Sequence, residues 1–375
     1  MRPETEGQLA EIVAGLNEPV RIVGGGTRGV TGPGAELSVA GLSGIELYEP
    51  GALTLVAKAG TPVAEIEAAL AAEGQRLAFE PMDHRGVLGT TGEPTIGGVV
   101  AANVSGPRRV QAGACRDFLL GVRYVDGSGQ VIKNGGRVMK NVTGYDLVKL
   151  MAGSWGTLGV LSEVSLKVLP KPETVATLVW HGCGWTAASK IFSDALTSPY
   201  EVSGAARLPE PKTDPNGVSR TLVRVEGFED SVKYRVSKLL ELFSDLKPDQ
   251  VVSESEENQL LWRSVRDVTP FSGRSGNIWK TSIKPTDLLR VAGTWDFEHI
   301  LDWGGGLIWT LAPEGVDLRA KLGKLDGHVS LVRAGMNDFE AFGRFHPEPV
   351  PLAAISAQLR QRFDPRGLFN PGLMG

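Results

Sequence analysis

The chain has 375 residues, of which 42% are hydrophobic, and a formal net charge of −4. This composition predicts a soluble globular protein of two or three domains and excludes a basic nucleic-acid-binding surface. No run approaches the roughly 20 apolar residues of a membrane span, and the polar start does not resemble a signal peptide, so we expect a cytoplasmic location. Cys115 and Cys183 lie far apart, which excludes a C-x-x-C metal or iron–sulfur site.

The first elements lead into a glycine-rich stretch. Residues 6–16 repeat apolar side chains at helical spacing and predict an amphipathic helix. A short apolar strand, 20–23, then enters GGGTRG at 24–29, which spells G-x-G-x-x-G. A Rossmann turn requires a helix after its third glycine, and Gly32-Pro33-Gly34 cannot propagate one. Either an anion-binding loop or an ordinary glycine turn remains.

Further elements follow in a regular order up to residue 170. They are a strand at 52–60, a helix at 61–74, a hairpin at 118–133, a short helix at 144–153 and an alternating strand at 159–170. Thr61 is expected to cap the helix that Pro62 opens, and Asp126–Gly129 to form the hairpin turn.

The second half has a different texture. Glycine becomes rarer, and strands alternate with longer helices, which is typical of an α+β fold. Five of the eight tryptophans lie between Trp262 and Trp309, where we expect core or interface anchors. One more helix precedes a tail punctuated by proline and glycine.

Four glycine-rich motifs follow one another in the first half: GGGTRG, TIGGVVAANVSG, RDFLLG and GYDLVKLMAGSWGTLGVLSE. In this order they resemble the PCMH-type FAD-binding domain of the vanillyl-alcohol-oxidase flavoproteins, a family that includes D-lactate and D-2-hydroxyglutarate dehydrogenases. The resemblance implies an α+β fold with a two-part FAD-binding domain over 1–170. A cap over 171–345 and a C-terminal helix and tail over 346–375, returning to the flavin, would complete it.

A narrower resemblance extends from end to end. The stretches GPRR, GGRVMKNVTGYDL, ILDWGGGLIW, GHVSLVRAG and FDPRGLFNPGLM are similar to the FAD-binding subunits of bacterial glycolate oxidases. This similarity implies oxidation of glycolate, or of another small 2-hydroxy acid such as D-lactate, to the keto product. It also implies a homologous catalytic flavin subunit and an iron–sulfur subunit as partners, electron transfer to quinone, and membrane contact only through those partners.

The resemblance further implies non-covalent FAD. The first loop and Thr95–Gly98 would cradle the pyrophosphate, Asn103–Gly106 and Gly113–Asp117 would lie near the flavin, and Gly156–Val160 would contact the nucleotide end. The cofactor residues expected are Gly24, Gly25, Gly26, Thr27, Arg28, Gly29, Thr95, Ile96, Gly97, Gly98, Ala101, Asn103, Ser105, Gly106, Arg108, Gly113, Arg116, Asp117, Gly156, Thr157, Gly159, Val160 and Asn370. For Asn103 and Asp117 a role in turn geometry remains the alternative.

Catalysis would need a base and cations for the substrate carboxylate. Candidates are His84, His328 and Arg333, with Lys280 as a weaker one. His328 and Arg333 would point to opposite faces of a strand unless a bulge intervenes. The paired-histidine metal motifs of related dehydrogenases are not present, so no metal is expected and independent activity is in doubt. An assembly subunit with a structural flavin, or a stand-alone flavin oxidoreductase with another substrate, are the alternatives.

Overall fold

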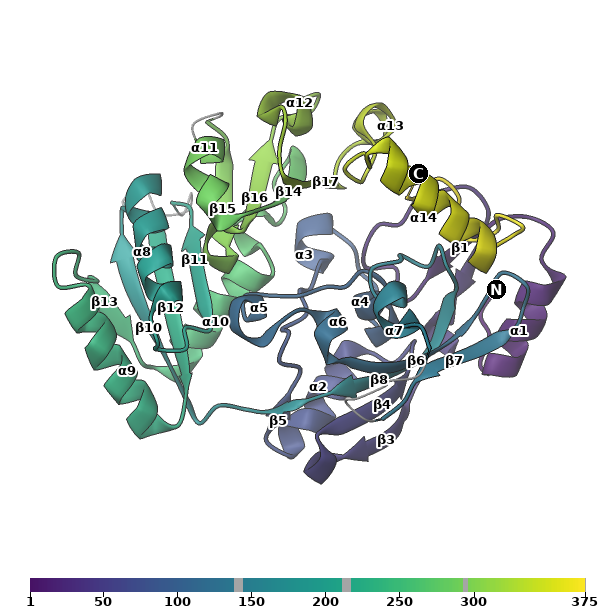
Figure 1. Cartoon of the computed structure of the whole chain (residues 1–375), viewed down its shortest axis with the longest axis horizontal. Coiled ribbons are helices and arrows are strands. Elements are labelled where there is room, and N and C mark those ends of the chain that lie inside the picture. The colour runs from purple at the N-terminus through teal and green to yellow at the C-terminus, as the bar shows by residue number, and fades with distance from the viewer. Residues whose placement is uncertain (138–143, 211–216, 293–295, 375) are drawn as a thin grey trace.

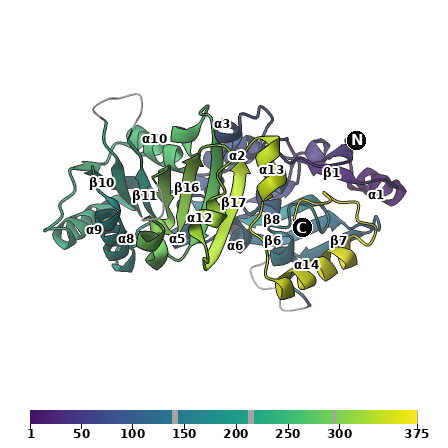
Figure 2. The same ribbon diagram turned by 90° about the horizontal axis from the view of Figure 1, so that it is seen from above.

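The computed structural model describes residues 1–137, 144–210, 217–292 and 296–374. Part of the GGRVMKNVTGYDL motif and Trp295 lie outside these ranges. Two bodies stand side by side along the longest axis, an N-terminal domain and a cap domain, with the C-terminal segment returning to the first (Figures 1 and 2). Helices and strands are mixed throughout, which confirms the predicted α+β fold.

A five-stranded antiparallel sheet forms the centre of the N-terminal domain. Its strands, in spatial order, are β3 (Ile45–Glu49), β4 (Thr54–Lys58), β8 (Val160–Lys167), β6 (Leu119–Val125) and β7 (Val131–Gly135). The β6–β7 hairpin turns where the sequence predicts, because the Asp126 Oδ1 atom accepts the backbone N–H groups of Ser128 and Gln130.

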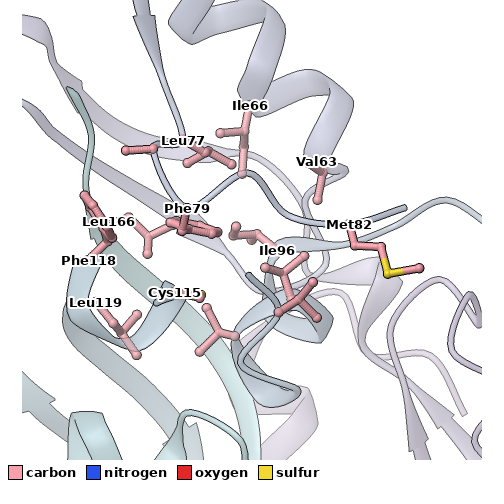
Figure 3. Packing of buried hydrophobic residues seen from close by; sticks show 14 of the residues in the cluster. Val63, Ile66, Leu77, Phe79, Met82, Ile96, Cys115, Phe118, Leu119 and Leu166 are labelled. Atoms are coloured by element: carbon pink, nitrogen blue, oxygen red, sulfur yellow. The ribbon is translucent and has the colours of Figure 1, made fainter. Parts of the chain in front are cut away.

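Short helices lie on this sheet and between it and the cap. They are α2 (Val63–Ala72), α3 (Arg85–Leu88), α4 (Ile96–Ala101), α5 (Arg109–Ala112), α6 (Cys115–Phe118) and α7 (Leu147–Met151). Figure 3 shows the core between them, where the Phe79 and Phe118 rings lie 5.7 Å apart near Ile66 and Leu166. Thr61 does not cap α2, contrary to the prediction; its hydroxyl donates to the Lys58 carbonyl and ties the helix entry to β4.

The first glycine loop lies beside a separate small sheet. Helix α1 (Glu6–Gly15), capped by Thr5, precedes β1 (Val20–Val23), which pairs in parallel with β2 (Ala35–Ser38). The residues between these strands contain no helix, which confirms that the G-x-G-x-x-G stretch is not a Rossmann turn.

The cap is an eight-stranded sheet whose neighbours are all antiparallel. In spatial order it contains β13 (Gln250–Val252), β10 (Thr174–His181), β12 (Arg220–Gly227), β11 (Gly204–Leu208), β15 (Glu298–Asp302), β16 (Leu307–Ala312), β14 (Asn277–Ile283) and β17 (Gly327–Arg333). Its helices are α8 (Trp185–Thr197), α9 (Glu229–Leu242), α10 (Ser255–Arg266), α11 (Leu288–Ala292) and α12 (Leu318–Leu322). A two-stranded pairing of β5 (Gln75–Arg76) with β9 (Leu169–Pro170) marks the passage from the first domain.

One face of the cap sheet packs on its own helices, and the other joins the core of the N-terminal domain. Ile278, Ile300 and Trp309 belong to the same buried cluster as Phe79 and Ile96. Trp262, Trp279 and Trp309 are buried within the chain, which confirms their prediction as core anchors. The two domains therefore share a continuous apolar interior.

The C-terminal segment contains α13 (Met336–Phe342) and α14 (Val350–Phe363) before the tail. Figure 2 shows α14 lying over the β6–β7 side of the N-terminal domain, and its Phe363 ring lies 6.3 Å from that of Tyr124. The tail then pairs Phe369 with Val20 of β1. In the part of the chain that the structure describes, no helix is long and apolar enough to cross a membrane.

Candidate functional site

A cavity of about 400 Å³ lies where the first glycine loop meets α4 and the 155–161 segment. This volume is typical of small-molecule sites, which span roughly 300–1,000 Å³. Residues of the predicted cofactor set that line it are Gly24, Gly25, Gly26, Thr27, Arg28, Gly29, Thr95, Gly97, Gly98, Ala101, Gly156, Gly159 and Val160. Segments far apart in sequence thus meet where the motifs indicated.

The sequence motifs did not identify several other residues that line the cavity. They include Ile22, Val23, Ala59, Ala102 and Trp155. Ala59 could have been identified from the sequence, because it is a small residue at the end of a buried strand. A β-carbon placed at Gly97 would come within 2.6 Å of the Ala59 methyl group, so both positions must be small.

The glycines of the first loop serve two different purposes. A β-carbon at Gly25 would collide with the Glu93 carbonyl at 1.6 Å, and one at Gly24 with the Thr95 hydroxyl at 2.1 Å. These two glycines therefore allow the loop to pack on residues 92–95. Gly26 and Gly29 have φ angles of 73° and 56°, where glycine is favoured, and a β-carbon on either would project into open space.

Arg28 provides the charge of the cavity. Its side chain is buried, and its Nε atom has no hydrogen-bond partner among the described residues. Burial lowers the pKa of this guanidinium to about 10. The head lies over the start of α4, because a β-carbon at Gly98 would be 2.9 Å from its Nη1 atom. A buried, unpaired guanidinium is costly unless an anion binds beside it.

Several predicted cofactor residues hold two loops together. The Asn103 Oδ1 atom accepts the Arg116 N–H at 3.0 Å, and the Ser105 hydroxyl accepts the Cys115 N–H at 2.9 Å. Asp117 accepts the Ala114 N–H at 2.8 Å. Turn geometry, the alternative left open for Asn103 and Asp117, accounts for these contacts. The predicted residues outside the lining of the cavity are Ile96, Asn103, Ser105, Gly106, Arg108, Gly113, Arg116, Asp117, Thr157 and Asn370.

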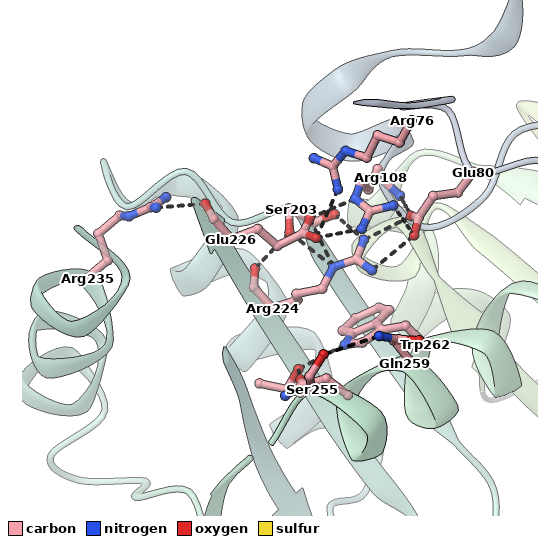
Figure 4. Close-up of polar contacts among 12 residues, drawn as sticks. Arg76, Glu80, Arg108, Ser203, Arg224, Glu226, Arg235, Ser255, Gln259 and Trp262 are labelled. Carbon is pink, nitrogen blue, oxygen red and sulfur yellow. Dashed lines mark hydrogen bonds and ion pairs between the residues drawn. The ribbon is translucent and has the colours of Figure 1, made fainter. Parts of the chain in front are cut away.

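Arg108 belongs to an ion cluster between the two domains (Figure 4). Its guanidinium contacts Glu80 of the N-terminal domain and Glu226 of the cap. Arg224 of the cap reaches Glu80 at 3.0 Å, and Arg76 reaches Glu226 at 3.2 Å. Although burial opposes ionisation, the surrounding arginines hold the pKa of Glu226 far below its usual range. Both carboxylates are engaged here, so Arg108 supports the interface and does not line the cavity.

Asn370 fastens the tail beside the cavity. Its side-chain oxygen accepts the Ile22 N–H at 2.7 Å, and its amide donates to the Trp155 carbonyl at 2.8 Å. Ile22 and Trp155 both line the cavity. Asn370 therefore positions two walls of the site without lining it.

None of the three predicted catalytic residues lines the cavity. His328 is exposed on β17, and its ring lies 6.2 Å from that of His346. The pairing of β17 with β14 shifts register before Arg333, so a bulge does intervene between the two. They still do not converge, because the Arg333 guanidinium donates to the backbone carbonyls of Val87 and Gly276.

His84, the third candidate, occupies a junction between the domains. It precedes α3, and its Nδ1 atom lies 3.3 Å from the Met82 carbonyl oxygen. Since a carbonyl only accepts, Nδ1 carries the proton and Nε2 keeps its lone pair. Burial, followed by the charges of Arg28 and Lys280, lowers the pKa of His84 well below 6.5. His84 is thus neutral at physiological pH.

A pair of cations faces one indole ring on the cap side. The Arg109 Cζ atom lies 4.4 Å from the ring centre of Trp303, and the Lys280 Nζ atom lies 5.5 Å from it. Neither cation forms an ion pair with a carboxylate within the described ranges. The Trp303 indole N–H donates to the Gly106 carbonyl at 3.0 Å, which places this pair beside the 103–106 segment.

Asp302 does not neutralise that pair. Burial raises the pKa of its carboxyl to about 8, and its Oδ1 atom accepts the Trp303 N–H at 2.7 Å. Burial also lowers the pKa of Lys280 to about 8. At neutral pH the amine is mostly charged and the acid mostly protonated, so the place has a net positive charge. Of these residues, the sequence identified Lys280 as a candidate. Asp302 and Trp303 were not identified, although the DWGGG turn that contains them could have indicated them.

Neither a metal cluster nor a reactive thiol accompanies these groups. The described residues contain no group of three or more histidine, cysteine or acidic side chains that could hold a metal. Cys115 is fully buried, and burial raises the pKa of its thiol to about 12. It therefore remains a protonated thiol in the core.

Comparisons with known proteins agree with this arrangement. Residues 1–135 match the family described as FAD binding domain. The glycolate oxidase subunit GlcE of Escherichia coli K12 is 36% identical over 345 residues, which cover 91% of this chain and 87% of that protein. Subunit GlcD of Bacillus subtilis 168 is 40% identical over 104 residues, 28% of this chain and 22% of that protein. A solved alkyldihydroxyacetonephosphate synthase shares the fold, with a TM-score of 0.70, 15% identity, and coverage of 99% of this chain and 76% of that one.

Proposed function

The chain belongs to the family of glycolate oxidase subunit GlcE and binds FAD, and we propose that it oxidises glycolate, or a similarly small 2-hydroxy acid, as one subunit of a larger oxidase. The observation that carries the cofactor assignment is the glycine-lined cavity with the unpartnered guanidinium of Arg28. A diphosphate supplies the anion that Arg28 lacks, and the open backbone at Gly26 and Gly29 admits it. Bound FAD would accept a hydride from the alcohol carbon.

The substrate carboxylate would be held from the cap side. Lys280 and Arg109 present two cations without carboxylate partners among the described residues, both close to the Trp303 ring. A carboxylate gains charge-assisted hydrogen bonds from both. The aromatic walls contributed by Trp303 and Trp309 strengthen these contacts by limiting access of water.

Electrons would leave through partner chains. With Cys115 and Cys183 as the chain's two cysteines, this chain cannot build a four-cysteine iron–sulfur cluster. A homologous flavin subunit and an iron–sulfur subunit are the proposed partners, in keeping with the name of its GlcE relative, which is an oxidase subunit. The proposed location is the cytoplasmic side, with membrane contact through those partners.

The test is a titration of the purified, FAD-loaded chain with oxalate, a small carboxylate without an oxidisable C–H bond. Oxalate is expected to perturb the visible flavin spectrum, and Lys280→Met to weaken its apparent affinity by about 10- to 100-fold, as expected for loss of a charged hydrogen-bond partner. Lys284 lies just beyond the end of the same strand, is exposed and is paired with Asp326, so Lys284→Met is the matched control. A chain that retains no FAD would contradict the cofactor part. A spectrum that oxalate leaves unchanged would contradict the substrate part.

A further inference from the structure

Trp155 is the one aromatic residue in the described lining of the cavity. Its side chain is half-buried, and its backbone adopts a φ of 53°, an unusual left-handed conformation for so bulky a residue. Two hydrogen bonds hold it there: its N–H donates to the Ala101 carbonyl at 2.9 Å, and its carbonyl accepts the Asn370 amide at 2.8 Å. Strained residues that are fixed in this way are concentrated at ligand sites. The fold thus maintains an unfavourable backbone conformation at a wall of the cavity.

A short segment between α13 and α14 supports this wall. The ring centre of Phe345 lies 5.4 Å from that of Trp155, and the two planes meet at 71°, the edge-to-face arrangement that aromatic pairs favour. The guanidinium of the preceding residue, Arg344, donates to the Gly29 carbonyl at 2.9 Å. Trp155 and Gly29 line the cavity, whereas Phe345 and Arg344 do not. Residues 344 and 345 therefore join two walls of the cavity without entering it.

The same segment is fastened to the edge strand of the cap sheet, β17. The Leu331 N–H donates to the Arg344 carbonyl at 2.8 Å, and the Arg344 guanidinium donates to the Val332 carbonyl at 3.3 Å. Arg319 of α12 donates to the Arg344 carbonyl as well, at 3.0 Å. These bonds fix the backbone that carries Phe345, so the position of its ring is set by the cap.

The distance between Trp155 and Arg28 indicates which part of FAD the indole meets. The Arg28 head lies beside Gly98, where a β-carbon would be 2.9 Å from its Nη1 atom. Trp155 meets the same helix, α4, at Ala101, which is three residues or about 5 Å further along. In FAD a single ribose joins the diphosphate to adenine, whereas a longer open ribityl chain joins it to the flavin. A ring this close to the diphosphate site suits the shorter, adenine arm.

Resting on the cofactor part of the proposed function, we propose that Trp155 stacks on the adenine ring of FAD and that Phe345 holds the indole in place for it. Trp155 is then a binding residue, and Phe345 is a positioning residue that acts through it. FMN has no adenine, so this contact makes the site selective for the dinucleotide form of the flavin.

The test is calorimetric titration of the purified chain, freed of FAD, with ADP and with FMN. Trp155→Leu fills the wall without a ring and should weaken ADP binding by about 5- to 150-fold, the range for loss of one stacked base. Its FMN affinity should stay at the wild-type value, which also reports an intact fold. Trp155→Phe keeps a ring and should lose less ADP affinity. Trp185→Leu is the control, because Trp185 is half-buried in the cap and stacks on His299.

Two results would overturn the stacking role. One is a Trp155→Leu chain that binds ADP as wild type does. The other is a loss of FMN affinity that equals or exceeds the loss of ADP affinity, since the indole would then serve the flavin arm or the cavity as a whole. These titrations require no turnover. A loaded chain that fails to oxidise glycolate would contradict the proposed oxidation and leave the stacking result standing.

The positioning role of Phe345 is tested by a double-mutant cycle. Phe345→Ala alone should weaken ADP binding by a smaller factor than Trp155→Leu and leave FMN binding unchanged. In the Trp155→Leu background it should add no further loss, because its effect passes through the indole. Phe228→Ala, at an exposed ring beside α9, is the control and should change neither affinity. Losses that multiply in the double variant would overturn the role of Phe345.

Discussion

At the residue scale, the buried charge of Arg28 is expected to affect the FAD-free protein and the FAD-loaded protein in opposite ways. Its Nε atom is buried without a partner among the described residues, so burial of this charge opposes folding until an anion arrives. Gly98 is required beside it, since a β-carbon there would approach the Arg28 head to 2.9 Å. The arginine at position 28 therefore lowers the stability of the FAD-free protein and is expected to raise its affinity for FAD.

Arg28→Met is therefore expected to act in opposite directions on the two forms. The apoprotein should melt at the same or a higher temperature, because the substitution removes an unpaired buried charge. The dissociation constant for FAD should rise by about 10- to 100-fold, from the loss of charge-assisted hydrogen bonds. Fluorescence titration with FAD and thermal melting provide the two measurements. Arg290→Met, at an exposed position of α11, is the control. Equal FAD affinity in Arg28→Met and wild type would contradict this role.

At the element scale, the C-terminal tail completes the first small sheet. Phe369 pairs with β1, and Asn370 bonds to the backbones of Ile22 and Trp155. Asn370 adopts a φ of 45°, a left-handed conformation that asparagine tolerates better than most residues. The tail is therefore part of the wall of the site.

Asn370→Ala should loosen this junction without unfolding the domain. It leaves the Ile22 N–H and the Trp155 carbonyl without partners, at a cost of about 1–3 kcal/mol. Hydrogen exchange is expected to accelerate in the tail and β1, and FAD to dissociate faster. The β6–β7 hairpin, stabilised by Asp126, should keep its protection. Uniform exchange throughout the N-terminal domain would contradict a local role.

The sequence predicted elements better than it predicted contacts. Periodicity located α1, β8 and the β6–β7 hairpin because each has a local cause: an apolar stripe, an alternation, or an aspartate-stabilised turn. The glycine pattern located the loop that lines the cavity. Gly24 and Gly25, however, are needed there because the loop packs closely on residues 92–95.

Partners distant in sequence could not be predicted in this way. Arg108 follows a flavin motif, but its carboxylate partner Glu226 lies 118 residues away. Nothing local to Trp303 indicates that its ring meets both Arg109 and Lys280. Such contacts depend on how the cap packs on the first domain, which no short pattern encodes.

At the scale of the whole molecule, the ion cluster of Figure 4 joins the two domains. Glu80 and Arg108 come from the N-terminal domain, and Arg224 and Glu226 from the cap. Because these groups are buried, removal of one partner leaves the others uncompensated. The cluster therefore holds the cap against the N-terminal domain.

Glu226→Gln should lower the free energy of unfolding by about 3–5 kcal/mol, the usual cost of breaking a buried ion pair. In wild type the pKa of Glu226 is far below its unfolded value of about 4.5, so its contribution is present above that pH and is lost as the pH falls. Denaturant unfolding between pH 4 and 7 should show wild-type stability decreasing toward acid, with a shallower dependence in the variant. Glu229→Gln, an exposed partner of Lys233, is the control and should leave the melting temperature unchanged. Parallel pH profiles for wild type and Glu226→Gln would contradict this assignment.

The most direct test of the account is anaerobic. The purified, FAD-loaded chain is mixed with glycolate without any partner subunit, and the visible flavin band is followed in a stopped-flow instrument. We predict that the band bleaches, because this chain carries its own cofactor cavity with Arg28 and, on the proposed function, the cation Lys280 for the substrate carboxylate. A band that stays oxidised until a homologous flavin subunit is added would show that the chain relays electrons or supports assembly, and would contradict the proposed oxidation by this chain itself.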